Sequence, residues 1–254
     1  MTQCLVMGDV HYDLRQLDWL LTRASEFDLV VLVGDLLDVS STVPLAAQVP
    51  VVLRYLERLA ERCPTAVCSG NHDLTGRDGD GEKSAAWLAD AAAAGVVVDG
   101  GSLVVSDALV SVFPWWDGPV GRARLEARLE AESEARAAAG AQASGRWIWV
   151  YHWPPPDLPV SWIGTKSYGD ADLAGWVERF APDLVLTGHV HQSPWTDGGS
   201  WISSLGRTWI VNAGKEVGPE PSYAVIDLDT WSASWWSVES TAAVSLDATE
   251  AVAQ

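Results

Sequence analysis

Short apolar runs with the length and composition of buried β-strands recur along the chain, and segments of helical character separate them. The runs before residue 190 are Gln3–Met7, Leu29–Val33, Thr65–Cys68, Leu109–Phe113, Trp147–Tyr151 and Leu184–Leu186. The helical segments are Leu14–Ala24, Leu45–Arg62, Lys83–Ala94 and Asp170–Phe180. Because strands that alternate with helices form β-α-β crossovers, the pattern predicts an α/β fold with a largely parallel central sheet.

The pattern changes near Gly199. Strand-like runs then follow one another with turns and no helix between them: Trp201–Ser204, Thr208–Val211, Tyr223–Asp227 and Ser234–Val238. We predict an antiparallel β layer that closes the same domain. The Ala-, Arg- and Glu-rich segment Gly121–Ala143 predicts a solvated helix with i,i+4 ion pairs. The domain is expected to span residues 1–238, and residues 239–254 are expected to form a disordered tail because they are small, acidic and aperiodic.

The charge of the chain narrows its possible partners. Its 16 Lys and Arg residues stand against 34 Asp and Glu residues, which gives a formal net charge of −18. Such a surface repels polyphosphate backbones and anionic lipid head groups, so a nucleic-acid polymer or a membrane surface is disfavoured as partner. A small phosphate ester remains compatible, because bound metal cations would invert the field at a local site.

Three observations indicate a cytoplasmic protein. No apolar stretch approaches the length that spans a bilayer, and the short run before Gly8 does not resemble a signal peptide. The three cysteines, Cys4, Cys63 and Cys68, are expected to be buried free thiols, which fits a reducing compartment.

All five histidines follow strand-like runs within a few residues. They occur in Gly8-Asp9-Val10-His11, Gly70-Asn71-His72-Asp73, Tyr151-His152 and Gly188-His189-Val190-His191. A fifth segment, Gly34-Asp35-Leu36-Leu37-Asp38, follows its strand-like run with carboxylates. Because the loops at the carboxyl ends of parallel strands converge on one sheet edge, these segments predict one shared site.

The residue types in these loops indicate a metal centre. Asp9, Asp35 and Asp38 would repel one another if crowded together, and a cation would remove that cost. Imidazoles and an Asn carbonyl beside carboxylates form a mixed nitrogen and oxygen ligand set, which suits Mn, Fe, Zn, Ni or Co better than Ca or Mg. Each loop alone has a structural alternative: Asp35 could precede a helix cap, Asn71 could be a turn residue and His152 could simply be packed. The ordered set of five loops makes coincidence remote.

The order Asp-x-His, Gly-Asp-x-x-Asp, Gly-Asn-His-Asp, a single His and Gly-His-x-His resembles the calcineurin-like metallophosphoesterases. The motifs run from Gly8 to His191, and Val211-Asn212-Ala213-Gly214 resembles the Asn-x-Gly turn that the family often carries after its last ligands. The resemblance covers roughly the first 225 residues. It implies a four-layer α/β/β/α sandwich of two facing mixed β-sheets, the metallo-dependent phosphatase-like fold.

The resemblance also implies roles for individual residues. Two divalent transition-metal ions would be bound by Asp9, His11, Asp35, Asn71, His152, His189 and His191. One ion would take Asp9, His11 and His191, the other Asn71, His152 and His189, with Asp35 bridging them. His72 would be the catalytic histidine, Asp73 would orient it, and Asp38 would lie just outside the ligands.

The function implied is hydrolysis of a small phosphodiester or phosphomonoester, nucleotide-like esters included, by a hydroxide that bridges the two ions. Val39-Ser40 follows Asp38 where Ser/Thr protein phosphatases carry Arg-Gly, and Ser69 stands where they carry Arg, which disfavours that branch. His72 stands where the lipid-A precursor hydrolases have Arg. A nuclease of the same superfamily and a non-catalytic interaction module on this scaffold stay open as alternatives.

Substrate-contacting residues are less defined by the sequence. Of the 15 tryptophans, Trp115, Trp116, Trp153, Trp162 and Trp195 lie in or near loops. Core packing is the first expectation for them, and stacking on a planar leaving group is the second. The basic candidates for phosphate contact are Arg77, Lys166, Arg207 and Lys215.

Overall fold

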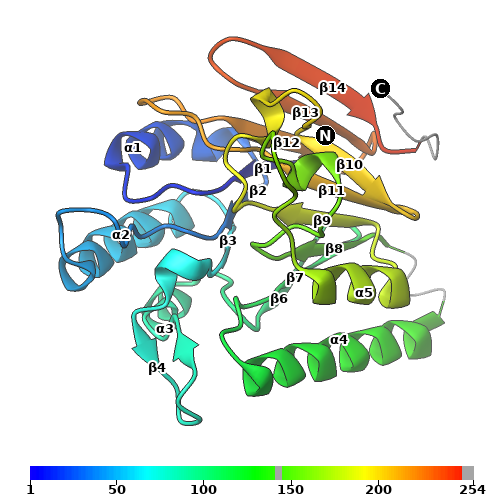
Figure 1. Ribbon diagram of the computed structural model, residues 1–254, viewed down its shortest axis with the longest axis horizontal. Helices are drawn as coiled ribbons and strands as arrows, with labels where there is room; N and C mark the ends of the chain where they lie inside the picture. Colours follow the sequence, from blue (N-terminus) through cyan, green and yellow to red (C-terminus); the bar gives the residue numbers. More distant parts are fainter. Residues whose placement is uncertain (141–144, 248–254) are drawn as a thin grey trace.

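Two six-stranded mixed β-sheets form the centre of the protein in a computed structural model that describes residues 1–140 and 145–247 (Figure 1). The first sheet has the order β14-β13-β12-β1-β2-β3. Its strands are β1 (Gln3–Met7), β2 (Leu29–Val33), β3 (Thr65–Cys68), β12 (Tyr223–Asp227), β13 (Ser232–Trp236) and β14 (Thr241–Ser245). Strands β1, β2 and β3 are parallel, and β12 joins β1 in antiparallel orientation.

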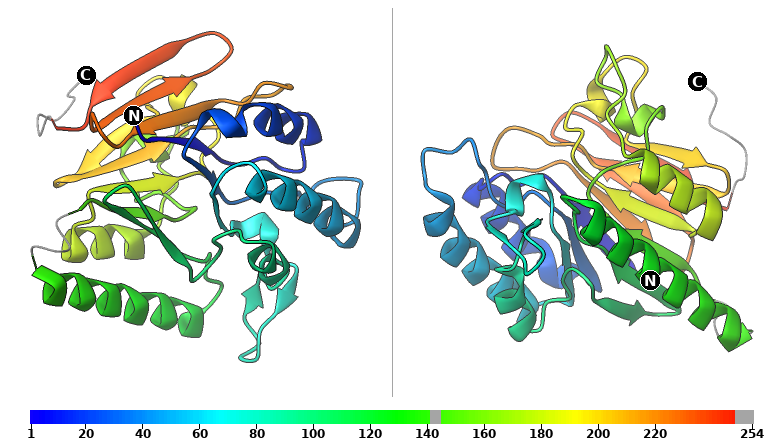
Figure 2. Two further views of the ribbon diagram at one scale, coloured as in Figure 1. Left: turned by 180° about the vertical axis from the view of Figure 1, so that it is seen from behind. Right: turned by 60° about the horizontal axis from the view of Figure 1, so that its bottom comes forward.

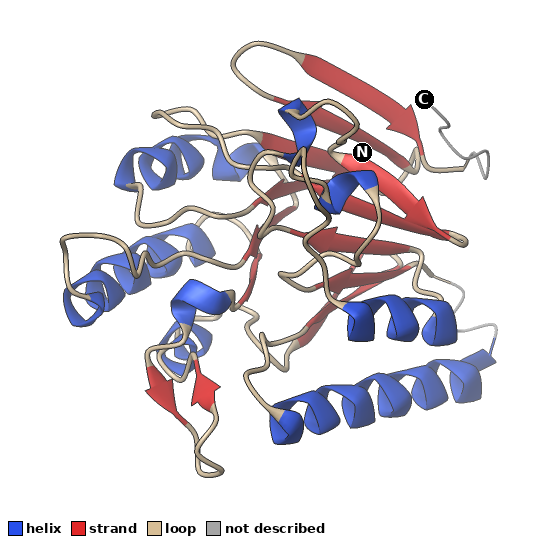
Figure 3. Ribbon diagram, in the orientation of Figure 1, coloured by secondary structure: helices blue, strands red, loops and turns tan. Residues whose placement is uncertain are grey.

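The second sheet has the order β10-β11-β9-β8-β7-β6. Its strands are β6 (Ser102–Val105), β7 (Ala108–Val112), β8 (Trp147–Val150), β9 (Leu184–Thr187), β10 (Ile202–Leu205) and β11 (Thr208–Asn212). Strands β7, β8, β9 and β11 are parallel, and the outer strands β6 and β10 are antiparallel to their neighbours. A small hairpin of β4 (Gly76–Arg77) and β5 (Lys83–Ser84) lies apart from both sheets (Figure 3).

Helices cover the outer faces of the two sheets. The helices are α1 (Leu14–Arg23), α2 (Leu45–Ala60), α3 (Leu88–Ala93), α4 (Pro119–Ala139) and α5 (Ala171–Phe180). Apolar side chains of α1, α2 and α3 share a buried cluster with the first sheet, and those of α4 and α5 share one with the second. Figure 1 shows α1 and α2 on one side of the molecule and α4 and α5 on the other. The four-layer α/β/β/α sandwich of facing mixed sheets is therefore confirmed.

Side-chain alternation explains why the strand runs are continuously apolar. In β2, Leu29, Val31 and Val33 belong to the cluster between the two sheets, whereas Val30 and Leu32 belong to the cluster under α1 and α2. Both faces of a central strand are thus buried, so neither needs polar residues. In each sheet the central strands are parallel, and the residues that follow strands of both sheets come together in shared groups of polar side chains. Figure 2 shows the molecule from two further directions.

Two expectations about secondary structure and one about the domain boundary need correction. The strands after Gly199 do not form one antiparallel layer: β10 and β11 extend the second sheet, and β12, β13 and β14 extend the first. The helix expected over Lys83–Ala94 is shortened to α3, because Lys83 and Ser84 pair in the hairpin.

The expected domain end at residue 238 falls inside the first sheet, because Thr241–Ser245 forms edge strand β14 against β13. Its side chains are small and mostly exposed, so the strand lacks the apolar alternation that would have revealed it. Residues 248–254 of the expected tail, and residues 141–143 of the helix expected over Gly121–Ala143, lie outside the described residues. No helix in the described part of the chain is both long and apolar enough to cross a membrane.

Candidate metal centre

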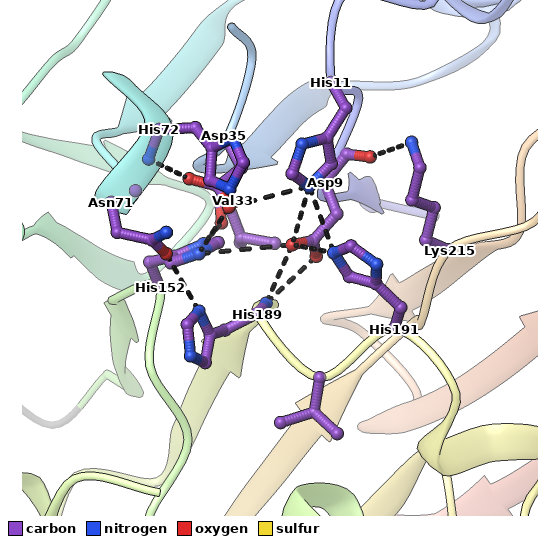
Figure 4. A network of polar contacts seen from close by, with 12 residues as sticks. Asp9, His11, Val33, Asp35, Asn71, His72, His152, His189, His191 and Lys215 are labelled. Carbon is purple, nitrogen blue, oxygen red and sulfur yellow. Dashed lines mark hydrogen bonds and ion pairs between the residues drawn. The ribbon is translucent and has the colours of Figure 1, made fainter. Parts of the chain in front are cut away.

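The predicted ligands meet at the carboxyl ends of five parallel strands (Figure 4). Asp9 and His11 follow β1, Asp35 follows β2, Asn71 begins the short 3₁₀ helix η2 (Asn71–Asp73) after β3, His152 follows β8, and His189 and His191 follow β9. These segments are far apart in the sequence, and both sheets contribute to the cluster. The described side chains form three groups close enough to hold a metal ion: Asp9, His11 and His191; Asp35, His152 and His189; and a third, His11, Asp38 and His72, that shares His11 with the first.

The first group consists of Asp9, His11 and His191. The Nε2 atoms of the two histidines lie 3.0 Å apart, and Nε2 of His191 lies 3.2 Å from Oδ1 of Asp9. The Asp9 side chain is fully buried and also accepts the His189 N–H at 3.0 Å. Two imidazole nitrogens and a carboxylate oxygen thus face one small volume.

The second group consists of Asp35, His152 and His189. His152 Nε2 lies 3.3 Å from Asp35 Oδ2. His189 Nδ1 lies 2.9 Å from Oδ1 of Asn71, so the amide oxygen adjoins this group. Both nitrogen and oxygen donors are therefore available at the second position.

Asp35 lies between the two groups. The same oxygen, Oδ2, is 3.6 Å from His11 Nε2 of the first group and 3.3 Å from His152 Nε2 of the second. Its other oxygen accepts the His72 backbone N–H at 2.8 Å. Burial opposes ionisation of Asp35, but the adjacent His152 outweighs burial and holds the pKa of the carboxyl below its usual value. Asp35 is therefore a carboxylate fixed between two sets of imidazoles.

The surroundings of His152 fit a metal ion. Its Nδ1 lies 2.6 Å from the carbonyl oxygen of Val33, so Nδ1 carries a proton and Nε2 is the nitrogen that faces the carboxylates. Nε2 is buried and has no hydrogen-bond partner among the described residues. Burial acts to lower the pKa of His152, but the charges of Asp35 and Asp9 outweigh it and raise that pKa to about 9. A cation would satisfy this nitrogen and both carboxylates together.

His11 and His189 are also suited to bind metal, because burial lowers the pKa of each imidazole to about 4. Each ring is therefore neutral near neutral pH and keeps a lone pair for a metal ion. The mixed set of imidazole, carboxylate and amide donors is the one that divalent transition metals favour.

The loop backbones are strained where the ligands lie. Asp9, His11, Asp35 and His189 have positive φ angles of 54°, 47°, 50° and 66°. Residues other than glycine adopt this conformation at an energetic cost, and such strain clusters at functional sites.

The glycines before the ligands have a specific steric role. A Cβ atom at Gly34 would lie 2.5 Å from His152 Nδ1, and one at Gly188 would lie 2.6 Å from Asp9 Oδ2. Backbone and ligands can approach this closely only because these positions carry no side chain.

His72 lies beside the first group, its ring centroid 4.4 Å from that of His11. The Val39 backbone N–H donates to His72 Nδ1 at 3.2 Å, so the proton of the neutral ring resides on Nε2. Asp38 is the carboxylate that faces this ring, with Oδ1 3.6 Å from Nδ1.

Asp73 does not have the contacts expected of a residue that orients His72. Its Oδ1 accepts the backbone N–H groups of Leu36 and Leu37 at 3.0 and 2.9 Å, and its Oδ2 accepts the Gly70 N–H at 2.8 Å. The side chain is fully buried, and burial together with the charge of Asp35 raises its pKa to about 7. Consecutive residues of the 3₁₀ turn point in different directions, so Asp73 fastens the loop after β2 to the loop after β3 and does not orient the His72 ring.

The family model for calcineurin-like phosphoesterases matches residues 3–193, which contain all of these groups. The chain belongs to this family. Among solved structures, TT1561 of Thermus thermophilus is similar at a TM-score of 0.61 and 17% identity, over 96% of this chain and 99% of that one. A dimetal phosphatase from Danio rerio is similar at a TM-score of 0.60 and 11% identity, over 92% and 95% of the two chains. No curated protein sequence matches significantly. At these identities the structures support the shared fold alone.

Two residues position the site of this metallophosphoesterase from outside the ligand groups, and only Asn212 had a distinct signal in the sequence. Gln48, buried on α2, accepts the Asp38 N–H and donates to the Asp38 carbonyl, which fixes the loop after Asp35. Its polar side chain on a helix face that is otherwise apolar was the one available hint. Asn212 of the Asn-x-Gly turn donates to Val190 O at 2.9 Å and accepts the Gly214 N–H at 2.9 Å, so it holds the loop between His189 and His191.

The four basic candidates lie in different places. Lys215 is next to the first ligand group, with Nζ 2.5 Å from Asp9 O and 3.1 Å from Val10 O (Figure 4). Lys166 lies over the ring of Tyr168, beside the second group. Arg77 bonds within its own hairpin, and Arg207 precedes β11 at the opposite sheet edge, where it pairs with Asp183.

The loop tryptophans also separate into two sets. Trp115 and Trp153 have ring centroids 5.5 Å from that of His189, so they border the centre. Trp195 packs against Trp235 instead. Trp116 packs against the cluster under α4 and α5, as Trp153 also does on one side, and Trp162 donates to Asp197 O.

Proposed function

We propose that this metallophosphoesterase is an enzyme that uses two divalent metal ions to hydrolyse a small phosphodiester or phosphomonoester. The observation that carries the proposal is the position of Asp35, whose Oδ2 faces His11 on one side and His152 on the other. Asp9, His11 and His191 would hold one ion, Asn71, His152 and His189 the other, and Asp35 would bridge them. Mn, Fe, Zn, Ni and Co are the candidate metals.

Two such ions, when bound, polarise phosphoryl oxygens and make a water molecule nucleophilic near neutral pH. The protein residues supply the remaining chemistry. Protonated Nε2 of His72 can donate to a phosphoryl oxygen or to the leaving oxygen, and the Asp38 carboxylate beside the ring can stabilise its charged form. The strained loops and the backbone contacts of Asp73 keep the ligands in place before substrate binds.

Two alternatives have weaker support. A nuclease of this superfamily would need to attract a polyanion, and the net charge of −18 opposes that. A non-catalytic interaction module would not need buried carboxylates facing unpaired imidazole nitrogen, nor His72 beside them. The buried free cysteines agree with a reducing compartment such as the cytoplasm.

Metal analysis of protein purified without added ions, joined to a substrate panel, tests the proposal. We expect two equivalents of transition metal per chain and hydrolysis of p-nitrophenyl phosphate or bis(p-nitrophenyl) phosphate. Asn71→Ala should bind one equivalent less, because it removes a donor of the second group only. Negligible turnover with every candidate metal would favour the interaction module, and a higher rate on DNA than on small esters would favour the nuclease.

A further inference from the structure

Three aromatic rings surround the exposed side of the second ligand group. Trp115, Trp153 and Tyr168 have ring centroids 5.5, 5.5 and 6.2 Å from that of His189, and we call them the aromatic wall. They come from two connections: Trp115 follows β7, and Trp153 and Tyr168 lie 15 residues apart between β8 and α5. Rings brought to one proposed metal ligand from separate parts of the chain indicate a function of the site more than the packing of one element.

The wall is rigid and accessible. Trp115 and Trp153 stack with their centroids 4.9 Å apart and their planes 18° apart, and Ser69 Oγ accepts the Trp115 backbone N–H at 3.0 Å. The Tyr168 loop is fixed by a hydrogen bond of 2.7 Å from its N–H to Ser161 O. The two tryptophans are half-buried, and Tyr168 is 42% exposed. Trp153 packs on one side against the apolar cluster under α4 and α5. The partly exposed tryptophan surface and the Tyr168 ring at this polar site remain accessible to a ligand.

The charges near the wall restrict what binds there. A cavity of about 330 Å³ adjoins Trp115, and its lining includes four carboxylates, those of Asp78, Glu82, Asp99 and Asp117, but only two cationic side chains, Lys83 and Arg124. If the substrate carried a second phosphate group that extended past Trp115, these carboxylates would repel it. The Lys166 ammonium, 4.5 Å from the Tyr168 ring, instead offsets charge at the rim of the wall. A flat, uncharged group is the better match.

We propose that the aromatic wall binds a planar aromatic group of the phosphate ester, such as a nucleobase or an aryl group, while its phosphoryl group lies at the metal ligands. This inference rests on the proposed function and adds the substrate class to it. Trp115, Trp153 and Tyr168 are then residues that determine specificity and not catalytic residues. Stacking on aromatic side chains accepts any flat π system, so the wall selects for planarity.

Two matched ligand pairs test the inference without relying on turnover. Calorimetric binding to metal-loaded His72→Ala protein, which should keep both ions but turn over slowly, is compared for adenosine 5′-monophosphate against ribose 5-phosphate, and for phenyl phosphate against methyl phosphate. Within each pair the charge is the same and only the aromatic group differs. We expect the aromatic member of at least one pair to bind about tenfold more tightly. A preference in the first pair alone assigns a nucleobase, and one in the second pair alone assigns a smaller aryl group.

Substitutions test which rings cause the tighter binding of the aromatic ligand. Tyr168→Ala, at an exposed position where folding is not at risk, should reduce the preference severalfold, and Trp153→Leu should abolish it. Trp236→Ala is the control, because Trp236 is also 42% exposed but stacks on Tyr223 away from the site. Equal binding within both pairs would overturn the inference. If the esters are still hydrolysed in that case, the proposed function stands, whereas loss of metal binding and turnover would reject the function itself.

Discussion

The two ligand groups of the metal centre differ in how much protein encloses them. In the second group, the side chain of His152 is 0% exposed and that of Asp35 is 2% exposed. In the first group, His191 is 39% exposed, although Asp9 beside it is fully buried. The second group is therefore the more enclosed half of the centre, and the first is the more open half, because of its exposed member His191.

The side chains of the more enclosed half are also held by more hydrogen bonds from outside their group. The far nitrogen of His152 is bonded to Val33 O, and Asp35 accepts the His72 N–H. For the open half, the contact to His191 is at its backbone carbonyl, which accepts the Lys215 N–H. Ligands held by protein on their far side keep their geometry without the ion, which favours affinity. The comparison teaches that the two positions of the centre should be unequal, with the enclosed position binding metal more tightly.

The largest expected effect comes from removing one histidine of each half. His152→Ala and His191→Ala should each lower hydrolysis by more than about 100-fold, because each deletes a proposed direct ligand. Excess metal should restore a substantial part of the activity of His191→Ala, since the open position can refill, and little of that of His152→Ala. Metal analysis after dialysis, followed by titration with added ions, measures both. If added metal restored the activity of His152→Ala but not that of His191→Ala, the first group would be the tighter metal position and the comparison would be wrong.

Substitution of His72, whose ring lies beside the first group, tests whether this residue acts on the substrate and does not bind metal. His72→Ala should keep both ions and lower kcat by about 10²- to 10⁴-fold, the usual effect of losing a positioned acid or base. Asp38→Asn should lower kcat less, with the metal content unchanged, because the carboxylate acts through the ring. If His72→Ala lost an ion instead, its assignment as a catalytic residue would be wrong.

The motif loops could be predicted from the sequence because their signal is local. A ligand such as Asp35 follows a buried strand directly, and parallel strands bring such loops together whatever the details of packing. Edge strands were harder to predict. Strand β6 has alternating exposure, and β14 is almost wholly exposed, so neither carries the apolar run that reveals a central strand.

The directions in which the loop side chains point were the second feature that could not be predicted from the sequence. His72 and Asp73 are adjacent, and the sequence suggested that one orients the other, yet Asp73 bonds backbone at Leu36 and Leu37. Asp38, distant from His72 in the sequence, faces the ring instead. Such pairings depend on the conformation of two loops after the strands end, which neither periodicity nor residue spacing determines.

Lys215 offers a smaller test on the open half. Its ammonium bonds the carbonyls of Asp9 and Val10, between two ligands of the first group. Lys215→Met should leave these carbonyls unpaired and loosen the loop, which lowers metal affinity at the open position by about tenfold. Lys215→Arg should recover part of the loss. Arg207→Met, at the opposite sheet edge, is the surface control. Equal loss of metal from both positions would contradict a role confined to the open half.

Asp99 allows a test, by thermal stability alone, of how the loop that carries Asn71 is held. It accepts the N–H of Ser69, two residues before Asn71, at 2.8 Å. Burial raises the pKa of Asp99 from 3.8 to about 6. Because the folded protein binds this proton more tightly than the unfolded chain, Asp99 should reduce stability as pH rises from about 4 to about 6, and by a constant amount above that, at most about 3 kcal/mol.

Asp99→Asn keeps an oxygen for Ser69 but removes the charge, so it should raise Tm at pH 7.5 by a few degrees and change it little at pH 4. Thermal unfolding of both proteins at the two pH values measures the difference, in which other titrating groups cancel. The ligands should be unaffected, since the acceptor for Ser69 remains, and metal stoichiometry should stay the same. A Tm difference that is equal at both pH values would show that the Asp99 charge is not its cause, because the two proteins differ in ionisation at this position only at the higher pH.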